Sequence, residues 1–162
     1  MKVYYRSPVG LLEIEESDGY ICGLLFADEP KENICEPSPL LKIAIKQLDE
    51  YFAGTRTYFE LPLKQKGTEF QQKAWDYLTT IPYGKTVSYK EEALAIGSPK
   101  GSRAVGSANG KNNIAIIVPC HRVVNEGGGL GGYAYGLEAK RWLLDMERLY
   151  KDANRNIDGL PY

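Results

Sequence analysis

The stretch from Ile114 to Val124 constrains the fold of this chain more than any other segment. It opens with an uninterrupted apolar run, Ile114–Val118, and continues through Pro119 into a cysteine, a histidine and an arginine. The run is rich in β-branched residues, which predicts a buried extended segment. Pro119 keeps the residue before it extended and removes a backbone donor where the chain turns. We therefore expect the thiol of Cys120 to be buried or half-buried, with an imidazole beside it.

Cys120 has two chemical interpretations. Free cysteine is among the most buried residue types, so the thiol can be read as a small core hydrophobe. It can also be read as a nucleophile, because a nearby base or cation lowers a thiol pKa and the thiolate is the reactive form. His121 is the only histidine of the chain, which excludes a papain-like dyad with a distant histidine. Neighbouring residues of an extended chain point apart, so His121 reaches Cys120 only if the Pro119 turn bends the chain or a water carries the proton.

Composition is that of a soluble globular protein, with 43% apolar and 25% charged residues. A chain of 162 residues suits one domain of ordinary size or two small ones. No apolar run approaches a membrane span, and the N-terminus lacks a signal-peptide core. Three cysteines without CxxC spacing indicate thiols in a reducing, cytoplasmic compartment. We expect no metal and no other cofactor.

Charge is distributed unevenly along the chain. Residues 1–63 carry six basic and eleven acidic side chains, whereas residues 64–122 carry nine basic and four acidic ones. Such asymmetry indicates that the middle third meets a polyanion such as DNA. Solvated charge scattered by chance is the alternative interpretation.

The first part of the chain, residues 1–63, predicts a small domain of strands followed by a helix. The expected elements are strands at Lys2–Arg6, Leu11–Glu16, Tyr20–Ala27 and Thr57–Leu61, and a helix that begins at Ser38-Pro39. Cys22 and Cys35 are expected to be packing or surface thiols. A basic linker over residues 62–67 lies where the composition changes.

Residues 68–151 carry strong helix signals. Thr68–Gln71 and Ser88–Glu91 match the capping box and each opens a helix. After a stop at Gly97, Ser98-Pro99 is expected to cap a third helix that runs to about Gly110. Two short helices joined by a tight glycine turn predict a helix-turn-helix.

The second of these helices is small and basic, with Lys100, Ser102 and Arg103 near its start. Its glycine, serine and alanine residues permit close backbone approach but offer few side chains for reading base edges. We expect sequence-tolerant binding in a narrow groove, with Arg103 as the one long probe. A packing helix with a solvated arginine is the other interpretation.

The C-terminal part holds a glycine-rich stretch, residues 125–136, and a last helix from Leu137 to about Lys151. The stretch lacks the Gly-Lys-Ser/Thr ending of a phosphate loop and predicts a flexible loop that approaches a flat ligand. Helical spacing predicts that the last helix buries Ala139, Trp142, Leu143, Met146, Leu149 and Tyr150. Glu147 then falls at the edge of the apolar face, from which a carboxylate can orient a histidine. The tail, residues 152–162, has no readable function.

The hexapeptide Pro119–Val124 resembles the active-site signature of the O6-alkylguanine-DNA alkyltransferases. The chain from about Phe70 to Glu147 resembles that family's DNA-binding domain throughout. The resemblance implies an α+β fold in two parts: a small ribonuclease H-like α/β N-terminal domain, then a mostly helical winged helix-turn-helix C-terminal domain. It further implies direct-reversal DNA repair, in which a monomer with no obligate protein partner binds double-stranded DNA containing O6-alkylguanine.

In the implied reaction the flipped-out base gives its alkyl group irreversibly to Cys120, and each molecule acts once. The expected assembly is Glu147–His121–water–Cys120, in which the carboxylate orients the imidazole that removes the thiol proton. By resemblance, Tyr89 donates to the guanine ring, and Asn112 fixes the active-site turn.

The resemblance also assigns the base pocket. The Tyr133 hydroxyl and the Ala134 backbone N–H serve O6, while the carbonyls of Cys120 and Val123 accept from the exocyclic amine. Arg103 corresponds to the arginine that fills the vacated space in the duplex. Tyr135 is bulkier than the glycine of some relatives and is expected to restrict large alkyl groups.

Two other classes of protein remain open from the residues themselves. One is a winged helix-turn-helix DNA-binding module in which Cys120 is structural. The other is a thiol hydrolase of a small acyl substrate.

Overall fold

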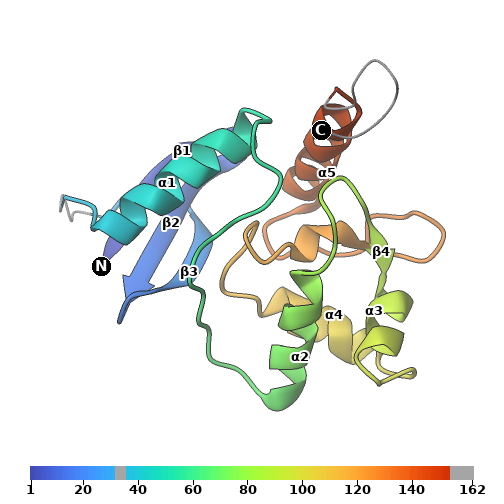
Figure 1. Cartoon of the computed structure of the whole chain (residues 1–162). Helices are drawn as coiled ribbons and strands as arrows, with labels where there is room; N and C mark the ends of the chain where they lie inside the picture. Colours follow the sequence, from blue (N-terminus) through green and yellow to red (C-terminus); the bar gives the residue numbers. More distant parts are fainter. Residues whose placement is uncertain (32–35, 154–162) are drawn as a thin grey trace. The chain divides into compact units, whose positions relative to one another are not determined.

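The computed structural model describes residues 1–31 and 36–153, so Cys35 and residues 154–162 lie outside the described part (Figure 1). The described residues cluster into two compact units. The first comprises residues 1–67 together with residues 112–118, and the second comprises residues 68–111 and those from 119 onward. A short central segment thus belongs to the N-terminal unit, and it ends just before the cysteine signature.

The first unit is a three-stranded antiparallel sheet with one helix packed on it (Figure 1). Its strands β1 (Lys2–Ser7), β2 (Gly10–Ser17) and β3 (Tyr20–Ala27) follow one another in the sheet, and α1 spans Pro39–Phe52. Ser38 caps α1 by accepting a hydrogen bond from the Leu41 N–H at 3.1 Å. The strands at the N-terminus and this helix confirm the sequence prediction.

The strand expected over residues 57–61 is absent, and within this segment the backbone of Glu60 is bound to a side chain of α1. The Gln47 side chain donates to the Glu60 carbonyl at 3.1 Å and accepts from the Glu60 N–H at 2.9 Å. The chain instead reaches the sheet slightly later, where Leu63 forms an isolated parallel bridge with Ile21. A buried side-chain amide can therefore replace a strand partner, which residue spacing does not reveal.

The apolar run Ile114–Val118 is buried, as predicted, but it is not extended. Only Ile114 pairs with a strand, through a bridge to Leu24, and the next residues turn sharply. Ile116 has a φ of 70°, a conformation that is strained for a β-branched residue. The turn is closed by a backbone hydrogen bond from Val118 N–H to the Ile114 carbonyl at 3.0 Å.

The second unit is mostly helical. Helices α2 (Glu69–Leu78), α3 (Tyr89–Ala95) and α4 (Ser102–Gly110) pack against one another, and α5 spans Leu137–Ala153. Short strands β4 (Val87–Ser88) and β5 (Val123–Val124) pair in parallel, and the 3₁₀ turn η1 covers Cys120–Arg122. Within residues 1–31 and 36–153, no helix has the length and hydropathy needed to span a membrane.

The helix-turn-helix is formed by α3 and α4, with one boundary that differs from the prediction. Gly97, with a φ of 81°, follows the end of α3 as expected. However, α4 begins at Ser102 with Gly101 as its N-cap, not at Ser98-Pro99. The Gly101 N–H donates to the Ser98 carbonyl at 2.8 Å, so these residues form the turn itself.

Helix α5 is rotated about its axis relative to the expected apolar face. Its buried residues are Lys140, Leu143, Leu144, Met146 and Glu147. Trp142 is 38% exposed and Leu149 is 66% exposed, so their predicted burial was wrong. Two charged residues lie on the buried face because partners elsewhere in the unit satisfy them, and these partners are part of the site described next.

Candidate active site

Cys120 opens the 3₁₀ turn η1 and is 9% exposed, which confirms the prediction of a buried or half-buried thiol. Pro119 precedes the turn, and its carbonyl accepts a hydrogen bond from the Arg122 N–H at 3.0 Å. The Val123 N–H donates to the Cys120 carbonyl. The bend after Pro119 that a neighbouring imidazole requires is therefore present.

His121 and Glu147 are paired, as the sequence predicted. The His121 Nε2 lies 2.6 Å from the Glu147 Oε2, and both side chains are fully buried. Helix α5 packs on η1, which brings together residues that are 26 positions apart. An ionised carboxylate only accepts hydrogen bonds, so it fixes the proton of the neutral imidazole on Nε2.

The other imidazole nitrogen of His121, Nδ1, is the atom that can act as a base. The His121 Nδ1 is buried and has no hydrogen-bond partner among the described residues. Burial lowers the pKa of His121, although Glu147 opposes that effect. A neutral imidazole with its lone pair on Nδ1 can accept a proton from a thiol or from a bridging water.

Arg122 is a site residue whose role the sequence did not reveal. Its Nε donates to Glu147 Oε1 at 2.8 Å, its Nη2 donates to Oε2 at 3.1 Å, and its Nη1 donates to the Ile81 carbonyl at 2.8 Å. The Gly84 N–H adds a contact to Glu147 Oε1 at 3.2 Å. Burial favours the protonated form of Glu147, but His121 and Arg122 outweigh it and hold its pKa well below the usual range.

Lys140 is the second residue that sequence reasoning missed. Its ammonium group is buried and donates to the Val123 carbonyl at 2.6 Å and to the Gly132 carbonyl at 2.9 Å. Burial lowers its pKa to about 8, while negative charge on Cys120 acts in the opposite direction. By the same interaction, the positive charge of the lysine favours the thiolate. A lysine at helical spacing from Leu143, Leu144 and Glu147 was the available signal.

Three tyrosines also respond to charge on Cys120. Burial raises the pKa of Tyr89, Tyr133 and Tyr135, and a negative sulfur raises each of them further. The rings of Tyr133 and Tyr135 meet edge to face, with centroids 5.6 Å apart. Charge on the sulfur therefore acts on all three of these predicted residues, and Ala134 lies between two of them in the chain.

Tyr89 connects this cluster to the helix-turn-helix. Its hydroxyl lies 3.3 Å from the Gly132 nitrogen, and a Cβ added to Gly131 would come within 2.7 Å of the tyrosine ring. On the α4 side, a Cβ at Gly106 would lie 3.7 Å from the same ring. Glycine at 131, whose φ is 72°, therefore permits the loop to approach Tyr89 closely.

The three expected DNA-binding residues lie at the start of α4 or just before it. Arg103 and Lys100 are exposed, and Ser102 is half-buried. The opposite side of α4 is fixed in the unit, because the Trp75 indole donates to the Ala108 carbonyl at 2.9 Å. Arg103 is one helical turn from Gly106, which places it on the face next to Tyr89.

Asn112 belongs to the first unit, where its side chain holds the turn that precedes the cysteine. Its Nδ2 donates to the Val118 carbonyl at 2.8 Å, and its Oδ1 accepts from the Ile114 N–H at 3.0 Å. Val118 is two residues before Cys120 in the chain. These contacts are of the kind expected for a residue that fixes the active-site turn.

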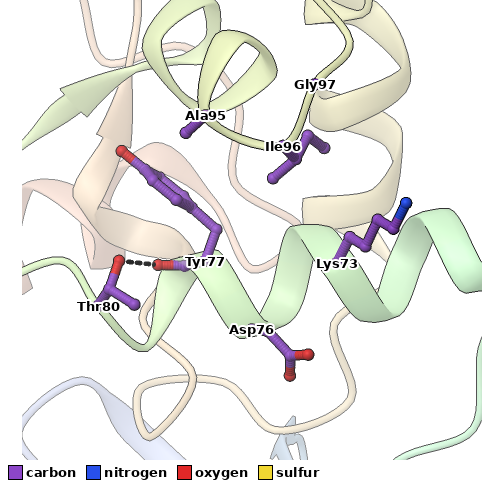
Figure 2. A pocket seen from close by; sticks show the side chains of 7 residues that line it. All are labelled: Lys73, Asp76, Tyr77, Thr80, Ala95, Ile96 and Gly97. Atoms are coloured by element: carbon purple, nitrogen blue, oxygen red, sulfur yellow. Dashed lines mark hydrogen bonds between the residues drawn. The ribbon is translucent and has the colours of Figure 1, made fainter.

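A surface groove of about 580 Å³ lies between α2 and the end of α3 (Figure 2). Its lining includes Lys73, Asp76, Tyr77 and Thr80 from α2 and the turn after it. None of the expected site residues lines it. In the part of the chain that the structure describes, no group of at least three histidine, cysteine or carboxylate side chains is arranged to hold a metal ion.

Fold and site define a two-unit protein in which a buried Cys–His–Glu arrangement accompanies a helix-turn-helix. Residues 69–149 match the DNA binding domain of 6-O-methylguanine DNA methyltransferase, and residues 1–65 match its ribonuclease-like domain. The chain belongs to this family, which confirms the resemblance and the two-part fold.

Individual relatives agree along most of their length. The constitutive methylated-DNA–protein-cysteine methyltransferase of Bacillus subtilis is 47% identical, with 91% of this chain and 95% of that protein covered. The methylated-DNA–protein-cysteine methyltransferase of Mycobacterium leprae is 55% identical over 88% of each chain. The crystal structure of Mycobacterium tuberculosis OGT in complex with DNA is similar at a TM-score of 0.82 and 44% identity, covering 91% of this chain and 92% of that one.

Proposed function

We propose that this protein repairs alkylated DNA by moving the alkyl group of O6-alkylguanine irreversibly to the Sγ of Cys120. The observation that carries this proposal is the buried pair of Glu147 on α5 with His121 on the turn that presents Cys120, in a chain of this family. Its activity is that of a methylated-DNA–protein-cysteine S-methyltransferase.

The first step is removal of the thiol proton. Glu147 holds the Nε2–H of His121, which leaves Nδ1 to take the proton from Cys120 through a bridging water. The positive charge of Lys140 stabilises the resulting thiolate. The thiolate then attacks the alkyl carbon in line with the carbon–oxygen bond, which breaks with its electrons remaining on the guanine.

The guanine anion is a poor leaving group, so it needs a proton or a hydrogen-bond donor as the bond breaks. We assign these donors to Tyr89, Tyr133 and the Ala134 backbone N–H. The carbonyls of Cys120 and Val123 accept from the exocyclic amine. Each already accepts one hydrogen bond, from Val123 N–H and from Lys140 respectively, and each has a second lone pair.

The product is a thioether, whose carbon–sulfur bond is stable to water, so each molecule reacts once. The target atom is inaccessible inside a duplex, and the nucleotide must leave the stack to reach the sulfur. We assign duplex binding to α4, with Arg103 filling the vacated space and Lys100 and Ser102 meeting the backbone. We further propose that the protein acts as a monomer in the cytoplasm, without a protein partner.

The test is intact-mass spectrometry after incubation with duplex DNA containing O6-methylguanine. The wild-type protein should gain the mass of one methyl group in place of a proton, mapped by peptide digestion to Cys120. Cys120→Ser should bind the same DNA without any mass gain, whereas Cys22→Ser should react like the wild type. A DNA-binding module with a structural cysteine would gain no mass, and a thiol hydrolase would turn over acyl substrates; either outcome rejects the proposal.

A further inference from the structure

Gln65 makes two hydrogen bonds to the segment that precedes the cysteine signature. Its Nε2 donates to the Asn112 Oδ1 at 3.1 Å, and its Oε1 accepts from the Asn113 N–H at 2.9 Å. Gln65 and both partners belong to the first unit. The side-chain amide therefore bridges two consecutive residues that are 47 and 48 positions away in the sequence.

Asn112 carries this contact onward to the turn. Its Oδ1 accepts from the Ile114 N–H as well as from Gln65, and its Nδ2 donates to the Val118 carbonyl. Asn112 is 4% exposed, so its amide depends on these protein groups and not on water for its hydrogen bonds. Gln65 and Val118 are thus the two ends of one hydrogen-bonded chain through a single buried amide.

Backbone groups determine which atom donates and which accepts in each hydrogen bond that links Gln65 to Val118. The Asn113 N–H can only donate, so it must face the Gln65 oxygen and leave the Gln65 nitrogen to face Asn112. The Val118 carbonyl can only accept, so it must face the Asn112 nitrogen. The orientation of Asn112 that holds Val118 is consequently the orientation that Gln65 requires.

Both partners of this contact are attached to the same strand. The segment that carries Gln65 is bound to β3 by the Lys64 N–H, which donates to the Ile21 carbonyl at 3.0 Å. The segment after Asn112 is bound to β3 by the Leu24 N–H, which donates to the Asn113 carbonyl at 2.8 Å. Gln65 therefore links two segments, its own and the one that starts at Asn112, that are each hydrogen-bonded to β3.

We propose that Gln65 is a positioning residue for the Cys120 nucleophile. It orients Asn112, Asn112 holds the Val118 carbonyl, and Val118 is bonded to the proline that starts the Cys120 turn. The proposed effect is carried along the chain from Val118 to Cys120. The part of this inference that concerns the repair rate rests on the proposed alkyl transfer. The effect of Gln65 on the reactivity of the Cys120 thiol does not, because that reactivity can be measured separately.

The first experiment compares Gln65→Met with Gln47→Met. Gln47 is a matched control, because its amide also makes a donor and an acceptor bond, to the backbone of Glu60 in the same unit. Two readouts are taken: methyl transfer at saturating O6-methylguanine duplex, and alkylation of Cys120 by iodoacetamide, mapped by mass spectrometry. The fraction of folded protein is measured for each variant by thermal unfolding.

Gln65→Met removes both hydrogen bonds and should slow both reactions by about 3- to 10-fold, which corresponds to the net free energy of about one hydrogen bond, with unchanged DNA affinity. Gln47→Met should lower the melting temperature but leave both rates of the folded protein unchanged. If Gln65→Met reacts at the wild-type rate, or if the two variants lose rate equally, the positioning role is wrong. If the wild type fails to transfer methyl groups, the proposed function fails, and the iodoacetamide rates still decide the role of Gln65.

A second variant, Gln65→Glu, separates positioning from simple loss of packing. The introduced carboxylate keeps the acceptor for the Asn113 N–H but places a second oxygen against the Asn112 Oδ1. A protonated carboxyl restores a donor there, so the rate relative to wild type should rise as the pH falls from about 6.5 to about 4, through the ordinary carboxyl range. A relative rate that does not change with pH would overturn the proposed orientation of Asn112.

Discussion

The imidazole of His121 and the carboxylate of Glu147 are 2.6 Å apart and fully buried, and Arg122 donates to both oxygens of the same carboxylate. Glu147 therefore serves as the common acceptor for two neighbouring residues of the turn that presents the thiol. Its charge cannot be removed without affecting both the tautomer of the imidazole and the buried guanidinium. The pair thus contributes to reactivity and to stability at once.

Glu147→Gln is expected to slow methyl transfer by about 100-fold at saturating DNA, because the amide no longer fixes the proton of His121 on Nε2. It should also lower the free energy of unfolding by about 3 kcal/mol, because Arg122 keeps a buried charge without its counter-ion. Single-turnover kinetics and urea unfolding measure the two effects. Glu138→Gln, an exposed change on the same helix, is the control and should alter neither. A transfer rate close to wild type would show that Glu147 has no part in activating the thiol.

Lys140→Met should raise the pKa of the Cys120 thiol. Charge on the sulfur raises the pKa of Lys140, and the same interaction favours the thiolate when the lysine is charged. We expect a rise of about one unit, measured from the pH dependence of iodoacetamide alkylation at Cys120. Arg148→Met, an exposed change on α5, should leave that titration unchanged. An identical thiol titration in both variants would place Lys140 outside the electrostatics of the sulfur.

Helix α5 also shows where sequence reasoning reached its limit. Hydropathy predicted that Trp142 and Leu149 face inward on α5, whereas the structure exposes both and buries Lys140, whose burial was not predicted, on the same face as Glu147. A charged side chain is buried only when partners compensate its desolvation, and those partners come from η1 and the glycine-rich loop. Periodicity within one helix contains no information on partners that distant segments supply.

Local chemistry was predicted well where it depends on neighbours in the chain. The reciprocal capping box at Thr68 and Gln71 forms as expected, as does the Ser88 cap of α3. The pairing of His121 with Glu147 was also predicted, because a carboxylate close to an apolar helical face can reach inward. In contrast, the run around Ile116 turns rather than extends, because Asn112 binds its backbone, a contact that residue types alone do not show.

The stability of the helix-turn-helix should fall as the pH rises towards neutrality. Glu92 of α3 is fully buried, and its Oε1 accepts from the Asn109 Nδ2 of α4 at 2.7 Å. The Glu92 Oε2 and the Asn109 Oδ1 have no partner within the described residues, and a proton on Glu92 would let the two groups bond. Burial raises the pKa of Glu92 to about 7, although Asn109 opposes this. Its charge would also act on Tyr77 and Tyr89.

The sign of the effect follows from proton binding. Between the ordinary pKa of 4.5 and about 7 the folded state keeps a proton that the unfolded state has lost. The stabilisation is therefore complete below this window and lost across it, by at most about 3 kcal/mol. Glu92→Gln should remove this slope, because an amide donates to the Asn109 Oδ1 at every pH. Urea unfolding at several pH values tests this, with exposed Glu91→Gln as the control; equal slopes in all three proteins would contradict it.

Arg103→Ala should weaken repair of duplex DNA far more than reaction with the free base. Arg103 is exposed on α4, one turn from Gly106, where an added Cβ would lie 3.7 Å from the Tyr89 ring, so its long side chain can occupy the space that a flipped nucleotide leaves. Extruding a paired base costs a few kcal/mol, so losing this support should slow transfer from duplex by about 10- to 100-fold. Transfer from the free base O6-methylguanine, which needs no extrusion, should stay within about 2-fold of wild type, since no duplex must be opened. Arg141→Ala, an exposed change on α5, should affect neither substrate. Equal losses of rate on duplex and free base would instead assign Arg103 to the chemistry of the site, and the flipping role would have to be abandoned.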